Sequence, residues 1–194
     1  MQVEELAPGL WRWTGLHPDW TPKDGGPNGW EQEVGCVYVE TDGAVILIDP
    51  LVPPEDRDRF WEALDGDVEG KHVRILLTCE WHGRSAKEIA ERYGGEVGSE
   101  PPRGLVPIEV APLEETLWWI PTHGALVAGD VLLGDEEGGV RLCPESWLQG
   151  RSDPDAIRGI LGVLLDLPVE RVLVSHGEPV LEGGRDALAR ALSP

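Results

Sequence analysis

Ionisable residues follow four apolar segments of this sequence. Asp49 comes after VILI, Asp130 after LVAG and His176 after VLVS, and residues 78–84 (TCEWHGR) come after ILL. Crevices beyond the ends of strands are favoured ligand sites, and ionisable groups suit such places. We therefore predict one pocket that these segments share. Its predicted lining is Asp49, Cys79, Trp81, Arg84, Ser85, Asp130 and His176.

These residue types allow proton transfer or metal binding. Carboxylates and imidazoles transfer protons, and with thiolates they are common metal ligands. The candidates for a catalytic role are Asp130, His176, Arg84 and His82. If a metal binds, the expected ligands are Asp130 and His176 with Cys79 or His82, and the further candidate ligands are Glu80, His17 and Asp19.

Composition excludes several classes of partner. The 194 residues include 16 Lys and Arg against 36 Asp and Glu, a formal charge of −20, so nucleic acid and anionic membranes would repel the chain. We find no apolar run near the roughly 20 residues of a membrane span and no signal-peptide pattern, and we expect a cytoplasmic protein. The three cysteines are odd in number and far apart, without a CxxC pair, so we expect neither a disulfide framework nor a zinc finger.

The elements that must position the pocket alternate between hairpins and single helices. Strands are expected at 3–6, 10–13, 35–40, 44–48, 73–77, 105–110, 117–120, 125–128 and 171–175, and helices near 54–66, 85–93, 154–165 and 185–192. The third helix should start at a cap in Ser152-Asp-Pro154, and the second at the capping-box spacing of Ser85 and Glu88. The Gly- and Pro-rich residues 14–33 are expected to form a lid loop. This order predicts a single α/β (α+β) domain over 1–194, in which two sheets pack face to face with helices outside.

Four segments, in order, resemble the metallo-β-lactamase superfamily, which includes glyoxalase II-like hydrolases. They are GCVYVETDGAVILIDP, ILLTCEWHGRSAKEIAERYGG, WWIPTHGALVAGDVLLG and RVLVSHGEPV. The resemblance spans about residues 3–192. It implies a four-layer αββα sandwich of two mixed β-sheets flanked by helices.

The metal-binding motif of that family is mostly absent. The family pattern is Thr-His-x-His-x-Asp-His, and alignment on Thr78 places Cys79, Trp81, Gly83 and Arg84 at the four ligand positions. The family's middle histidine would fall near residues 111–113, where the sequence has none. The resemblance retains only Asp130, which matches the bridging aspartate, and His176, which matches the last histidine. We therefore expect a metal-free site in which Arg84 pairs with Asp130.

Three functions are consistent with this pattern. The first is a metal-free, non-classical or inactive hydrolase homologue, without cofactor, whose pocket takes a small anionic or carbonyl-containing ligand. The second keeps one zinc or other divalent ion and hydrolyses a small ester, thioester or lactone, and a metal-free hydrolase that uses Ser85 or Cys79 with His82 is a variant of the enzyme reading. The third is an interaction or oligomerisation module, for example a homodimer, that uses Trp20 and Trp30.

Overall fold

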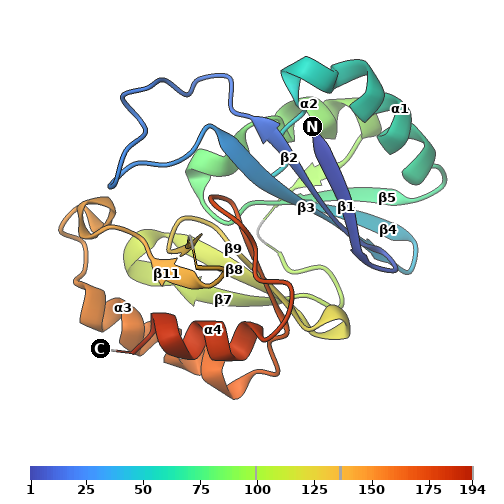
Figure 1. Ribbon diagram of the computed structural model, residues 1–194. Coiled ribbons are helices and arrows are strands. Elements are labelled where there is room, and N and C mark those ends of the chain that lie inside the picture. Colours follow the sequence, from blue (N-terminus) through green and yellow to red (C-terminus); the bar gives the residue numbers. More distant parts are fainter. Residues whose placement is uncertain (99, 136, 194) are drawn as a thin grey trace.

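Two mixed sheets form the centre of the computed structural model, which describes residues 1–98, 100–135 and 137–193 (Figure 1). The first sheet has the order β1-β2-β3-β4-β5-β6. Its strands are β1 (Gln2–Ala7), β2 (Leu10–Leu16), β3 (Glu33–Thr41), β4 (Ala44–Ile48), β5 (His72–Leu76) and β6 (Glu96–Val97). Neighbours are antiparallel from β1 to β4 and parallel from β4 to β6.

The second sheet has the order β12-β9-β8-β7. Its strands are β7 (Val106–Val110), β8 (Glu115–Ile120), β9 (Ala125–Ala128) and β12 (Arg171–Val174), and only β12 and β9 are parallel. A separate hairpin consists of β10 (Leu132–Gly134) and β11 (Val140–Leu142).

Strand alternation divides the apolar side chains into three cores. On β3, Val37 and Val39 face the second sheet and pack in one cluster with Trp118, whereas Cys36 and Tyr38 face the other way. Those outward residues pack in the cluster that includes buried residues of the helices α1 (Arg57–Asp67) and α2 (Ala86–Tyr93). This is the period of two that a strand buried on both faces requires.

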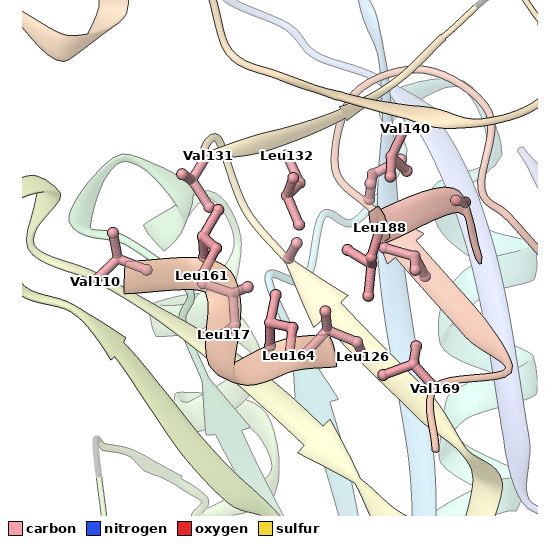
Figure 2. Close-up of a cluster of buried hydrophobic side chains, with 14 of the residues drawn as sticks. Val110, Leu117, Leu126, Val131, Leu132, Val140, Leu161, Leu164, Val169 and Leu188 are labelled. Atoms are coloured by element: carbon pink, nitrogen blue, oxygen red, sulfur yellow. The ribbon is translucent and has the colours of Figure 1, made fainter. Parts of the chain in front are cut away.

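The outer face of the second sheet packs against α3 (Pro154–Leu161) and α4 (Gly184–Ala191). Figure 2 shows this core, in which Leu117 and Leu126 from the sheet lie among Leu161, Leu164 and Leu188. Truncation of such a leucine to alanine costs about 2–5 kcal/mol. The layers are therefore helix, sheet, sheet, helix, which confirms the predicted αββα sandwich.

Several local predictions differ from the structure. Strand β2 continues to Leu16, so the predicted lid loop is shorter than 14–33 and covers residues 17–32. The hairpin of β10 and β11 and the two-residue β6 were not predicted, because they are too short to show a period. The predicted capping box is wrong: the Ser85 side chain makes no cap, and its Oγ accepts a hydrogen bond from the Val52 N–H at 2.9 Å. Among the described residues, no helix has the length and apolar character needed to cross a membrane.

Candidate functional site

The predicted strand ends meet at one edge of the sandwich. Asp49 follows β4, His82 lies on the short 3-10 helix Glu80–Gly83 after β5, Asp130 follows β9 and His176 follows β12. The two sheets come close here, since the Gly35 N–H donates to the Ser175 carbonyl at 2.8 Å. Side chains that follow four separate strands can therefore share one site.

Asp49 and Thr78 fix one side of the His82 ring. Both carboxylate oxygens of Asp49 accept hydrogen bonds from Thr78, from its N–H at 2.8 Å and from its hydroxyl at 2.5 Å. His82 Nδ1 lies 2.9 Å from Asp49 Oδ2. All three residues are buried. An imidazole whose Nδ1 is held by a carboxylate presents its Nε2 in a defined direction.

That Nε2 lies close to Asp130. His82 Nε2 and His176 Nε2 lie 3.1 Å and 3.3 Å from the same atom, Asp130 Oδ1. Although this oxygen is buried, neither contact has the angles of a hydrogen bond, and Oδ1 has no hydrogen-bond partner among the described residues. Two nitrogens and an oxygen therefore lie close together without being directed at one another.

The charges of the site are strongly coupled. Burial by itself would raise the pKa of Asp130, but His176 and His82 outweigh it and hold that pKa well below its usual range. Burial would likewise lower the pKa of His82, but Asp49 and then Asp130 raise it well above 6.5. The pKa of His176 is lowered, mainly by burial. Without a metal, the neighbouring carboxylates thus favour the protonated form of His82.

Three residues around this cluster, without His176, form a group that could hold a metal ion. Ligand atoms of Cys79, His82 and Asp130 all lie within 4.8 Å of one another. In a tetrahedral zinc site with bonds of about 2.0–2.1 Å, nitrogen and oxygen ligands are about 3.3 Å apart, and the distances from Asp130 Oδ1 to the two Nε2 atoms are 3.1 and 3.3 Å. Two further features are expected of such a site. Asp130 Oδ1 is buried without a hydrogen-bond partner in the described part of the chain, and Asp49 contacts the other nitrogen of the His82 ring.

Arg84 does not have its predicted partner. The predicted ion pair with Asp130 is wrong, because Arg84 Nη1 donates to the carbonyls of Asp49 at 3.1 Å and Gly35 at 3.3 Å. Asp49 and Arg84 both have a positive φ, of 52° and 26° respectively. The guanidinium of Arg84 therefore stabilises the backbone of Asp49 and, with it, the position of the Asp49 carboxylate.

Glu115 is a residue of the site that the sequence analysis missed. Its two oxygens accept from the N–H groups of Gly129, at 3.1 Å, and Val131, at 2.9 Å, which flank Asp130. Burial, and then the charge of Asp130, raise the pKa of this carboxyl to about 8. Two adjacent acids before a strand resemble ordinary turn residues, so no local signal marks the second as buried.

A cavity of about 590 Å³ opens onto this cluster. Of the predicted residues, Cys79, Trp81, His82, Arg84, Asp130 and His176 line it, as does His17. Ser85 and Asp49 lie behind the lining, and neither Asp19 nor Glu80 is part of it. Trp30 of the predicted lid loop also lines the cavity, as does Trp147, whose Nε1 donates to the Asn28 carbonyl at 2.7 Å.

Comparison with known proteins identifies the fold. No protein-family model and no curated protein matches the sequence. Among solved structures, the DIM-1 metallo-β-lactamase exposed to ceftazidime aligns with a TM-score of 0.61 at 12% identity, over 99% of this chain and 97% of that one. A metallo-β-lactamase from Erythrobacter litoralis aligns with a TM-score of 0.59 at 15% identity, over 98% and 89% of the two chains. The chain therefore has the metallo-β-lactamase fold.

Proposed function

We propose that this chain binds one divalent metal ion and hydrolyses a small ester, thioester or lactone. The observation that carries the proposal is the approach of two imidazole nitrogens to the orphaned Asp130 Oδ1. The ligands would be His82, Asp130 and His176, with Cys79 as the fourth. This mixture of thiolate, imidazole and carboxylate favours zinc over magnesium or calcium.

The chain's own residues would orient the reaction. A bound zinc would supply Lewis-acid polarisation of a carbonyl and a nucleophile at neutral pH. Asp49 would keep the proton of neutral His82 on Nδ1, so that Nε2 offers its lone pair to the site. Asp130, whose pKa is well below its usual range, would remain a carboxylate at any working pH. Trp30 and Trp147 would limit the access of bulk water.

The test compares chelator-treated protein with the same protein after addition of zinc. We expect hydrolysis of simple thioesters, esters or lactones only after zinc is added, and loss of that activity in His176→Ala. A matched control is His72→Ala, because His72 is an exposed histidine on β5, outside the site. Equal activity with and without zinc would contradict the proposal.

A second candidate is the metal-free homologue expected from the degenerate motif. It is favoured by one observation: His82 lies within ion-pair distance of both Asp49 and Asp130, so an imidazolium there would offset their charges without any metal. In that case the cavity would serve as a binding site for a small ligand. The interaction-module reading has less support, because Trp30 lines the cavity and Trp20 Nε1 donates to the Trp30 carbonyl at 2.9 Å.

A further inference from the structure

We infer that the substrate is an uncharged carbonyl compound whose acyl group carries an aromatic ring or a similarly bulky apolar group, which packs against indole rings in the cavity. This inference rests on the proposed function, since it names the substrate class of the same site. It comes from the residues around the cluster of candidate ligands and from the charges that face the cavity.

Two indoles are held in place beside His176. The ring centroid of Trp30 lies 5.2 Å from that of His176, and the centroid of the Trp147 ring lies 6.1 Å from it. Both pairs are in edge-on arrangements. The hydrogen bond from Trp147 to Asn28 links the segment before α3 to the loop that carries Trp30. Two indole rings therefore form the wall of the cavity next to His176.

A third indole of the cavity is exposed. Trp81 precedes His82 on the helix Glu80–Gly83, lines the cavity and is 71% exposed, the highest value among the large hydrophobic side chains of the described residues. Leu113 adds further apolar surface to the lining. An apolar group that covers this ring gains about 25 cal/mol for each Å² of apolar surface removed from water. A ligand with a ring can also stack on it.

The two arginines that line the cavity each have polar contacts within the chain. Arg84 donates to the carbonyls of Gly35 and Asp49, and Arg151 forms an ion pair with Glu114 at 3.1 Å. The chain as a whole carries a charge of −20, which disfavours the approach of anions. Of the two ligand classes expected from the sequence, the carbonyl compound therefore suits the site better than the anion.

The size of the cavity agrees with a bulky group. Sites for drug-sized ligands are about 300–1,000 Å³, and this cavity of about 590 Å³ lies within that range. An acetyl group would leave most of the three indoles uncovered. A phenylacetyl group adds a ring that can pack against an indole.

The kinetic test compares hydrolysis of methyl acetate and methyl phenylacetate by the zinc-loaded protein. We expect kcat/KM to favour the phenylacetyl ester by about tenfold or more, as the burial of one ring allows. Trp81→Ala should remove most of this preference through KM, and Trp81→Phe should keep most of it. Val163→Ala, which truncates another exposed apolar side chain outside the cavity, should leave it unchanged.

A binding test separates this inference from the proposed function. Calorimetry on the full chain would compare phenylacetamide with acetamide, which need no catalysis. Tighter binding of phenylacetamide, weakened in Trp81→Ala, would support the apolar subsite even if no ester is hydrolysed, in which case only the proposed function fails. Equal affinity for the two amides, or no effect of Trp81→Ala, would overturn the inference even in an active hydrolase.

Discussion

Asp49 Oδ2 lies 2.9 Å from His82 Nδ1, and this buried contact sets the direction in which His82 offers its other nitrogen. His82 Nε2 in turn lies 3.1 Å from Asp130. A carboxylate after β4 thereby holds an imidazole after β5 close to a carboxylate after β9. The site thus depends on an aspartate that does not itself line the cavity.

Asp49→Asn should weaken zinc binding by about 10- to 100-fold, because the amide no longer supports the ligand histidine as a carboxylate does. Competition with a chromophoric chelator measures the affinity. Asp42→Asn removes the same charge from an exposed turn and should leave it unchanged. An unaltered zinc affinity in folded Asp49→Asn would show that Asp49 does not act through His82.

Gly129→Ala should destabilise the protein by about 1–3 kcal/mol, as overpacking of a tight site does. A Cβ at Gly129 would lie 2.4 Å from Thr78 Oγ1 and 3.1 Å from Glu115 Oε1. Urea unfolding measures the change. Gly159→Ala, at an exposed helical position with open space around its Cβ, should instead stabilise by about 0.5–1 kcal/mol. Similar changes for the two variants would contradict this explanation.

Glu115→Gln should change how stability depends on pH in the metal-free protein. The pKa of Glu115 is about 8 in the folded state and near 4.5 when unfolded, so the folded state binds the extra proton between these values. The contribution of Glu115 to the free energy of unfolding is fully present below about pH 4.5. It is lost as pH rises toward 8, by at most about 1.4 kcal/mol per pH unit.

Urea unfolding from pH 5 to 8 checks this prediction. The free energy of unfolding of the unmodified protein should fall more steeply with pH than that of Glu115→Gln. Glu114→Gln, at the neighbouring exposed acid, should retain the steep dependence. Parallel curves for the unmodified protein and Glu115→Gln would contradict the assignment of this titration to Glu115.

The order of the elements and the family resemblance predicted the layers, and strand ends predicted where several residues of the candidate site meet. Asp49, Asp130 and His176 each close an apolar strand, and ends of neighbouring strands meet at one edge. The pairing of Arg84 could not be predicted in this way, since it depends on carbonyls of Gly35 and Asp49 that only the folded backbone brings near.

His82 shows a second limit of sequence reasoning. Alignment on the family motif gives this position no ligand role, and the residue was only one of several alternatives. Its direction depends on the 3-10 turn Glu80–Gly83 and on the bond to Asp49, both of which are set by tertiary structure. His82 and Glu80 are both possible ligand types, and only the structure shows that Glu80 is exposed and not part of the cavity lining.

Zinc titration of the chelator-treated protein by calorimetry tests the central claim most directly. We predict one zinc per chain for the unmodified protein, and loss of tight binding in Asp130→Ala with the fold intact by circular dichroism. Asp135→Ala, an acid outside the site and its cavity, should bind zinc as the unmodified protein does. No stoichiometric binding, or binding that Asp130→Ala leaves unchanged, would contradict a metal centre formed by Asp130 and the two histidines.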